Sequence, residues 1–195
     1  MRWSARPSSA LRLIETALEG PLLLEPAVHG DERGFFAETY RRSVLTELGI
    51  DHDFVQDNHS RSGRGALRGI HFQIGEGQAK LVRCARGSIY DVVVDLRRGS
   101  PAYGRWEAAV LDDEAHRQLY VPVGFGHAFC ALSTEADVVY KCSSYYDPAT
   151  ERGIRYDDPD IGIEWPEVEL LVSERDATAP LLRDVAGALS FTYPG

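Results

Sequence analysis

The chain has 195 residues, of which 44% are hydrophobic, and it carries a formal net charge of -9 at pH 7. This length predicts a single domain with one well-buried core. The negative charge argues against nucleic acid or an acidic membrane surface as the main partner, because both attract net positive charge. No apolar run approaches the ~20 residues of a membrane span, and residues 1–20 lack the apolar stretch of a secretory signal. We therefore expect a cytoplasmic protein.

Short segments rich in Val, Ile, Phe and Tyr alternate with turn signals from residue 22 onward, which predicts an all-β sandwich or barrel. Residues 1–16 show little periodicity, so we expect a loosely ordered N-terminal extension before a single domain at residues 17–195. Strands are predicted at residues 81–84, 89–96, 118–121 and 137–145, and short helical segments at 43–48 and 180–189.

Two of these strands flank a tight turn signal. Residues 81–84 and 89–96 lie on either side of Arg86-Gly87, which predicts a β-hairpin. The run Val92-Val93-Val94 in the second arm predicts a strand that is buried on both faces.

The segment Leu67-Arg-Gly-Ile-His-Phe-Gln73 lies close to Lys80-Leu-Val-Arg83. Histidine can accept a proton near neutral pH, lysine can stabilise negative charge on an oxygen, and arginine binds phosphate through paired hydrogen bonds. Together they favour proton abstraction from an anionic substrate. A histidine beside a turn is also common as a structural residue, so His71 needs partners before it can be assigned a catalytic role.

Two segments resemble the paired signatures of the cupin superfamily of small jelly-roll barrels. Gly65 followed by five residues and His71 resembles the first signature, and Pro122-Val-Gly-Phe-Gly-His127 resembles the second. Metal-binding cupins continue the first signature with a second His and a Glu, but Gln73 and Gln78 stand at these positions. Because amides are poor substitutes for imidazole and carboxylate, we expect no metal. A metal-dependent cupin that uses His71 and His127 is the alternative.

The cysteines do not form a metal-binding pattern either. Cys84, Cys130 and Cys142 are odd in number and form no Cys-x-x-Cys pair. They are expected to be buried, reduced thiols rather than disulfides or zinc ligands.

The resemblance narrows to the dTDP-4-dehydrorhamnose 3,5-epimerase family of nucleotide-sugar epimerases. Its motifs follow in order along nearly the whole domain. They include Gly30-Asp-Glu-Arg-Gly-Phe-Phe36, Val55-Gln-Asp-Asn-His-Ser60, Leu67-Arg-Gly-Ile-His-Phe-Gln73, Lys80-Leu-Val-Arg83, Asp91-Val-Val-Val-Asp95, Val121-Pro-Val-Gly-Phe-Gly-His127, Tyr140-Lys141, Tyr145-Tyr146, Ile163-Glu-Trp-Pro166 and Ser173-Glu-Arg-Asp176.

The resemblance implies a cofactor-free enzyme that inverts C3 and C5 of dTDP-4-dehydro-6-deoxy-D-glucose. In the family pattern His71 is the base and Asp176 orients it, while Lys80 lies near the C4 oxygen. Tyr140 matches the acid that returns a proton to the opposite face. Residue chemistry alone leaves simpler readings open: Lys80 could form a structural salt bridge, and Tyr140 could be a buried strand aromatic.

The resemblance also implies a substrate-binding set and a homodimer whose partner subunit supplies part of the nucleotide pocket. Arg68 and Arg175 match phosphate contacts, and His127 is assigned a supporting role. The complete predicted set is Arg33, Phe36, Glu38, Gln56, Asn58, Arg68, Gln73, His127, Tyr146 and Arg175. Without the resemblance, Arg33 and Glu38 would be read as an ordinary surface ion pair.

One departure from the family pattern is Val123, which stands where the second signature commonly has a glutamate. This leaves the fold prediction unchanged but bears on substrate range. Related enzymes of antibiotic-sugar pathways invert C3 alone, and a C3-only epimerase is therefore the second functional hypothesis. Lys80-Leu-Val-Arg83 and Tyr140 favour the form that inverts both carbons.

Overall fold

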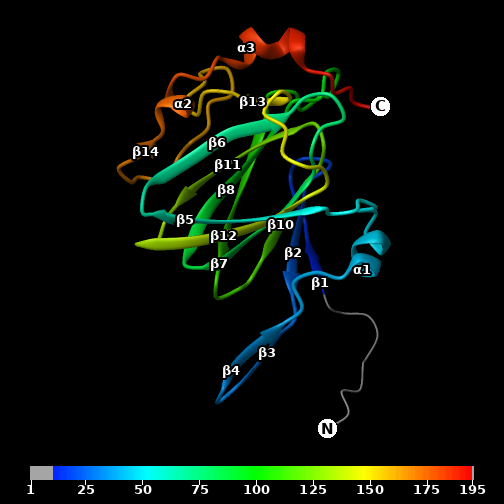
Figure 1. Ribbon diagram of the computed structural model, residues 1–195, viewed down its shortest axis with the longest axis vertical. Helices are drawn as coiled ribbons and strands as arrows, with labels where there is room; N and C mark the ends of the chain where they lie inside the picture. Colours follow the sequence, from blue (N-terminus) through cyan, green and yellow to red (C-terminus); the bar gives the residue numbers. More distant parts are fainter. Residues whose placement is uncertain (1–10, 195) are drawn as a thin grey trace.

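Two large β-sheets face each other in the structure, and a small two-stranded sheet projects beyond them (Figure 1). The computed structural model describes residues 11–194. The strands in this range are β1 (Leu11–Ile14), β2 (Leu22–Pro26), β3 (Val28–Asp31), β4 (Gly34–Ala37), β5 (Gln56–Gly63), β6 (Ala66–Gln73), β7 (Lys80–Arg86), β8 (Ser88–Asp95), β9 (Trp106–Asp112), β10 (Gln118–Val121), β11 (Phe125–Ala131), β12 (Glu135–Cys142), β13 (Glu151–Gly153) and β14 (Leu171–Val172). The helical segments are α1 (Arg42–Glu47), α2 (Glu174–Ala177), α3 (Leu182–Val185) and the 3₁₀ turn η1 (Ala186–Ala188).

The two large sheets are built mainly from antiparallel strand pairs. The first has the order β1-β2-β10-β7-β12-β5, and the second has β13-β6-β11-β8-β9, with β14 parallel to β6. Many neighbouring strands are distant in sequence, as expected of a jelly roll whose chain crosses repeatedly between two sheets. The prediction of an all-β jelly-roll barrel is confirmed. The predicted short helices are also present, one before β5 and the others after β14.

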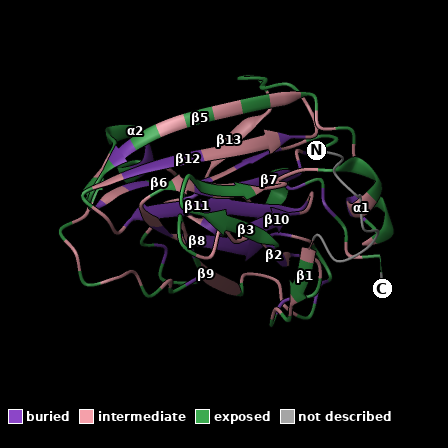
Figure 2. Cartoon of the chain, turned by 90° about the horizontal axis from the view of Figure 1, so that it is seen from below, coloured by how far each residue is buried: buried purple, intermediate pink, exposed green. Residues whose placement is uncertain are grey.

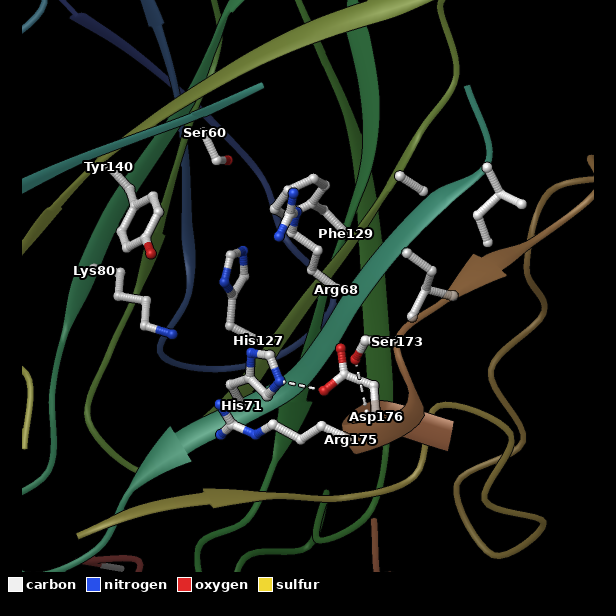
Figure 3. Close-up of a pocket in the computed structure, with 13 residues that line it drawn as sticks. Ser60, Arg68, His71, Lys80, His127, Phe129, Tyr140, Ser173, Arg175 and Asp176 are labelled. Atoms are coloured by element: carbon white, nitrogen blue, oxygen red, sulfur yellow. Dashed lines mark hydrogen bonds and ion pairs between the residues drawn. The ribbon is translucent and has the colours of Figure 1, made fainter. Parts of the chain in front are cut away.

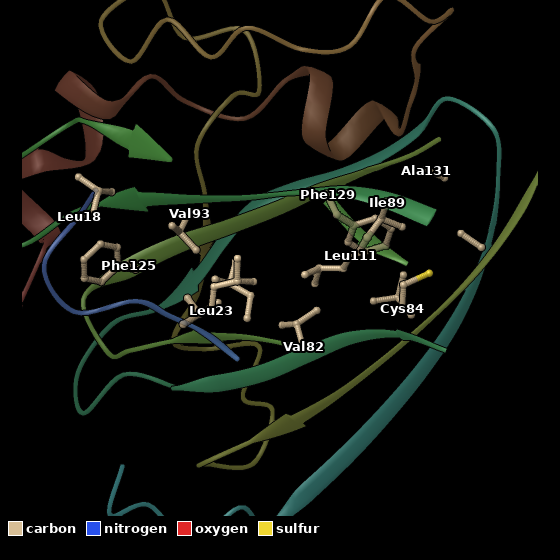
Figure 4. Close-up of a cluster of buried hydrophobic side chains, with 14 residues drawn as sticks. Leu18, Leu23, Val82, Cys84, Ile89, Val93, Leu111, Phe125, Phe129 and Ala131 are labelled. Carbon is tan, nitrogen blue, oxygen red and sulfur yellow. The ribbon is translucent and has the colours of Figure 1, made fainter. Parts of the chain in front are cut away.

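Apolar side chains from the facing sides of both sheets form the core between them (Figure 4). Side chains alternate along a strand, so every second residue reaches this layer. Val82 and Cys84 enter it from β7, Ile89 and Val93 from β8, and Phe129 from β11. Burial of each large apolar side chain contributes roughly 1.5–3 kcal/mol, so this layer fixes the two sheets against each other.

The second sheet is also covered on its outer face. Val92 and Val94 point away from Val93 and join a second apolar cluster with Leu182 of α3 and Leu189. The C-terminal helices lie over this face in Figure 1, and β11 is buried at every residue (Figure 2). The predicted burial of the Val92-Val93-Val94 run on both faces is confirmed.

The hairpin predicted around Arg86-Gly87 is wrong. β7 pairs with β10 and β12, whereas β8 pairs with β11 and β9, so the turn carries the chain from one sheet to the other. Gly87 has a φ of 75°, and a Cβ there would lie 2.2 Å from the Glu135 carbonyl oxygen. A tight turn suits both a hairpin and a crossing between facing sheets, and only the distant partner strands decide between them.

The N-terminal boundary also differs from the prediction. Residues 1–10 of the expected extension lie outside the described residues. Leu11–Ile14 form β1 and pair with residues 23–26 of β2, so this part of the expected extension belongs to the first sheet. Four residues are too few for the alternation of apolar side chains to stand out in the sequence.

Two further sequence predictions can be compared with the structure. The strand predicted at residues 137–145 runs from Glu135 to Cys142. All three cysteines are buried and free, as predicted. No helix within residues 11–194 is long and apolar enough to cross a membrane.

Candidate active site

A pocket of about 430 Å³ is lined by residues of both sheets and of the segment that contains β14 and α2. The first sheet contributes Ser60, Lys80 and Tyr140, and the second contributes Ala66, Leu67, Arg68, His71, His127 and Phe129. Leu171, Ser173, Arg175 and Asp176 complete the lining. The barrel therefore brings together residues that lie more than 100 positions apart in the sequence.

His71 points into the pocket because side chains alternate along β6 and its two neighbours face the other way. Ile70 and Phe72 pack into the outer apolar cluster, so the intervening side chain faces the barrel interior. Its Nε2 lies 2.7 Å from Oδ1 of Asp176, in a hydrogen bond drawn in Figure 3. With Nε2 held by the carboxylate, Nδ1 is the nitrogen that can accept a proton from a ligand.

Asp176 is fixed in place from several sides. Its Oδ2 accepts a hydrogen bond of 3.3 Å from the Gly69 N–H, and its own N–H donates to Oγ of Ser173, the N-cap of α2, at 3.1 Å. Burial alone would raise the pKa of Asp176, but the hydrogen bond and charge of His71, together with the contacts to Gly69 and Ser173, outweigh burial, so the pKa lies below its usual value. An ionised carboxylate in this position stabilises a protonated imidazole.

Tyr140 and Lys80 approach from the opposite sheet. Figure 3 shows them on one side of the pocket and His71 with Asp176 on the other. Burial raises the pKa of Tyr140, so its hydroxyl keeps its proton. Burial lowers the pKa of Lys80, while nearby Cys142, Asp91 and Glu151 act in the opposite direction.

The Lys80 ammonium group is available to a ligand. Within residues 11–194 it has neither a hydrogen bond nor an ion pair, so the structural salt bridge considered for it is not formed. A positive charge in this buried place can stabilise an oxyanion strongly, because little water screens it.

His127 lies directly beside His71 in the pairing of β11 with β6. Its Nε2 is 2.8 Å from Oδ1 of Asp91, and both residues are buried. Burial lowers the pKa of His127, and the contact with Asp91 opposes this shift. The hydrogen bond to Asp91 holds the His127 side chain, which forms part of the pocket wall.

Three residues at the positions of cupin metal ligands form hydrogen bonds within the protein. The side-chain amides of Gln73 and Gln78 are engaged with residues 144–147, and His127 is bound to Asp91. Among residues 11–194 there is no group of three or more His, Cys, Asp or Glu side chains that could hold a metal ion.

Two arginines provide positive charge at the pocket wall. Arg68 of β6 donates from Nε to Ser62 Oγ at 3.1 Å, and this exposed residue lines the pocket. Arg175 of α2 forms a 2.7 Å ion pair with Glu151. Paired N–H groups of this kind fit a phosphate or diphosphate.

Four predicted binding residues lie near the pocket but do not line it. Gln56 and Asn58 lie on β5, where Asn58 is directly opposite Tyr140. Gln73 is buried beneath residues 144–147. Tyr146 is exposed to solvent, and its hydroxyl donates to Glu151 at 2.9 Å.

Three other predicted binding residues lie away from this pocket. Arg33 lies in the turn between β3 and β4 of the small projecting sheet, Phe36 lies on β4, and Glu38 follows β4. The alternative that Arg33 and Glu38 form an ion pair with each other is wrong. Arg33 pairs with Asp31, which is two residues away, and Glu38 pairs with Arg41 at 2.5 Å.

Several pocket residues were absent from the predicted set. Ser60 contributes a buried hydroxyl that has no hydrogen-bond partner within residues 11–194, and Phe129 and Ser173 form part of the wall. The signal for Ser173 was present, because a Ser-x-x-Asp pattern is typical of the first turn of a helix. Glu151 was also missed, although it contacts both Tyr146 and Arg175.

The pocket can therefore move protons on two faces of a bound molecule. A carboxylate-supported imidazole lies on one sheet, and a protonated phenol and an ammonium group lie on the other. This arrangement suits removal of a proton from carbon next to a carbonyl group, stabilisation of the enolate and return of a proton to the other face.

Known proteins share both the sequence and the fold. The sequence profile of the dTDP-4-dehydrorhamnose 3,5-epimerase family matches residues 15–184. The chain is 51% identical over 173 residues to the dTDP-4-dehydrorhamnose 3,5-epimerase of Salmonella typhimurium, covering 87% of this chain and 94% of that protein. It is 45% identical to a dTDP-4-dehydrorhamnose 3-epimerase of Streptomyces niveus, covering 91% and 87% of the two chains.

A solved structure extends this likeness to three dimensions. The dTDP-6-deoxy-D-glucose-3,5-epimerase of Legionella pneumophila, in complex with dTDP-4-keto-L-rhamnose, superposes with a TM-score of 0.92 at 43% identity, covering 95% of this chain and all of that one. Sequence profile, relatives and fold agree, and the chain belongs to the dTDP-4-dehydrorhamnose 3,5-epimerase family.

Proposed function

We propose that this protein is an epimerase that converts dTDP-4-dehydro-6-deoxy-D-glucose to dTDP-4-dehydro-L-rhamnose, in the biosynthesis of dTDP-L-rhamnose or another deoxysugar. The observation that carries the proposal is the placement of the His71–Asp176 pair and of Tyr140 on opposite sheets around one pocket. Inversion at carbon needs a base on one face and an acid on the other, and this pocket supplies both.

The C4 ketone makes the hydrogens at C3 and C5 acidic, because their loss gives an enolate. Nδ1 of His71 takes the proton, and Asp176 stabilises the imidazolium that results. Lys80 stabilises the charge on the C4 oxygen, and Tyr140 donates its proton to the opposite face of the carbon. Exchange with solvent returns His71 and Tyr140 to their starting states, and no cofactor enters the sequence.

Incubation with dTDP-4-dehydro-6-deoxy-D-glucose in deuterated water tests this proposal. NMR of the product is expected to show inverted configuration and deuterium at both C3 and C5. Binding of dTDP without turnover or deuterium uptake would contradict an enzymatic role. Activity that depends on stoichiometric iron or manganese would favour the metal-dependent cupin alternative.

A C3-only epimerase is the second candidate. The 45% identical Streptomyces niveus relative bears the name of a 3-epimerase, so family membership alone does not fix the number of inverted carbons. The same NMR experiment separates the two candidates, because a C3-only enzyme gives deuterium at one carbon.

We also infer that the active protein is a homodimer. Phe35 and Phe36 of the projecting sheet are 62% and 53% exposed, and the predicted binding residues of this sheet lie away from the pocket of their own chain. A second copy would cover these rings and receive those residues at its nucleotide pocket. Light scattering is expected to give the mass of two chains, and a monomeric active enzyme would contradict the inference.

Lys80 is expected to set the alkaline limit of activity. Its ammonium form stabilises the enolate, and burial lowers its pKa below the ordinary ~10.4, so kcat should fall as pH rises through this lowered value. Burial raises the pKa of Tyr140, which moves the loss of its proton to higher pH. Lys80→Met should lower kcat roughly 10²–10³-fold and remove this limb from the pH profile.

The matched control for this prediction is Lys141→Met. Lys141 lies one residue after Tyr140 and is paired with Asp57 at 2.9 Å, outside the pocket. This variant should keep the alkaline limb. A Lys80→Met enzyme with an unchanged pH profile would exclude Lys80 as its origin.

A further inference from the structure

Residues 143–147, which we call the rim segment, connect β12 to the loop before β13 and carry two of the most exposed aromatic residues among residues 11–194. Tyr145 is 72% exposed and Tyr146 is 52% exposed. Large exposed aromatic side chains on a loop have many conformations available, and holding one of them costs conformational entropy. The contacts that hold the rim segment therefore decide whether Tyr146 already has its ligand-binding conformation before a ligand arrives.

Gln73 holds the rim segment from below. Its carboxamide donates to Ser144 Oγ at 3.2 Å and to the Tyr145 carbonyl oxygen at 3.4 Å, and it accepts from the Asp147 N–H at 2.8 Å. The residue is only 6% exposed, so these contacts are shielded from water. Both ends of the amide are engaged with the rim segment and neither lines the pocket.

Two further glutamines hold the rim segment at other points. Gln78 donates to the Ser144 carbonyl oxygen at 2.8 Å, and Gln56 accepts from the Tyr146 N–H at 2.9 Å. The three glutamines come from β5, β6 and the turn before β7, so they hold the rim segment from both sheets. Gln73 makes more of these contacts than either of the others.

The rim segment is connected to the pocket through one carboxylate. Tyr146 donates its hydroxyl hydrogen to Glu151 Oε2 at 2.9 Å, and the same oxygen lies 2.7 Å from the Arg175 guanidinium group. Arg175 lines the pocket next to Asp176. Glu151 is also the residue of β13 that pairs with Gln73 of β6, so Gln73 adjoins this connection both at Glu151 and on either side of Tyr146, through Tyr145 and Asp147.

We propose that Gln73 is a positioning residue that fixes Tyr146 and, through Glu151, Arg175, and thereby sets the affinity for the nucleoside diphosphate sugar. This inference rests on the proposed function and changes the predicted role of Gln73 from direct to indirect substrate binding. Because the contacts lead to Arg175 and not to His71 or Tyr140, loss of Gln73 weakens binding and leaves proton transfer nearly unchanged.

Gln73→Met tests the proposal, because methionine keeps the length of the side chain but removes its donors and acceptor. KM for the dTDP-sugar should rise about tenfold, the effect of one or two lost buried hydrogen bonds, while kcat stays within about twofold. Calorimetry with dTDP should show a comparable loss of affinity. This second measurement needs no turnover, so it tests the positioning role even if the proposed reaction is wrong.

The matched control is Gln118→Met. Gln118 is a buried glutamine of β10, and its Nε2 has no hydrogen-bond partner in the described part of the chain. KM and dTDP affinity should stay unchanged in this variant. An equal rise of KM in both variants would show a general effect of losing a buried amide and would overturn the proposal.

A double-mutant cycle with Tyr146→Phe tests the route of the effect. If Gln73 acts through Tyr146 and Glu151, Gln73→Met should raise KM by much less in the Tyr146→Phe background than in the wild type. Full additivity, or an unchanged KM in Gln73→Met, would overturn the proposal. Should Gln73→Met fail to fold, Gln78→Met and Ser144→Ala replace it, with smaller rises in KM expected and unchanged KM values counting against it.

Discussion

Replacement of His71 by asparagine is expected to lower kcat roughly 10²–10⁴-fold, the usual contribution of a general base. Asparagine is smaller than histidine but can still form a hydrogen bond with Asp176, so the pocket should remain intact. KM should change little, because the diphosphate is held by Arg68 and Arg175 in the proposed complex. In deuterated water, exchange at C3 and C5 should fall together with kcat, both in the product and in recovered substrate.

His59→Asn is the matched control for this variant. His59 lies on β5 of the opposite sheet, is exposed, and approaches Asp137 at 3.4 Å outside the pocket. Its replacement should leave kcat and deuterium exchange unchanged. If His71→Asn retained most of its turnover, a different base would have to be sought among the pocket residues.

The sequence predicts the all-β fold well because the signals for strands and turns each lie within a few consecutive residues. Strand-like runs separated by turn signals are present throughout, and the buried Val92-Val93-Val94 run correctly indicates a strand covered on both faces. The partner of a strand is not local information. The turn at Arg86-Gly87 therefore predicts a hairpin, whereas the structure uses it to cross between sheets.

The four residues that we propose as catalytic could be selected from the sequence for a similar reason. His71, Lys80, Tyr140 and Asp176 each stand in a recognisable motif, and the barrel brings all four to one pocket. The part that is missed depends on contacts between distant segments. Gln73 belongs to the same motif as His71, but its partners lie more than 70 positions later, in residues 144–147.

The projecting sheet shows a second limit of prediction from sequence. The motif around Arg33 and Phe36 matches nucleotide-binding residues, yet these residues lie away from the pocket of their own chain. A motif records residue types in order along one chain and contains no direct information on which copy of the chain they serve. Exposure of the aromatic rings, which only the structure gives, is the observation that favours a dimer.

Tyr140→Phe is expected to separate proton removal from inversion. The variant keeps the ring that packs against the core but loses the hydroxyl, whose pKa is raised by burial and whose proton is therefore held for donation. Formation of the epimerised product should slow roughly 10²–10⁴-fold. His71 remains able to remove a proton and return it to the same face. Deuterium should therefore continue to enter recovered substrate with its configuration retained, and KM should be nearly unchanged.

The matched control is Tyr120→Phe. Tyr120 is a buried tyrosine of β10 in the same sheet, and burial raises its pKa to about 12, but it does not line the pocket. Its loss of a hydroxyl should leave both the rate and the stereochemistry unchanged. If Tyr140→Phe epimerised at the wild-type rate, the proton would have to come from another donor on that face, and Lys80, which lies beside Tyr140 in Figure 3, would be the group to test next.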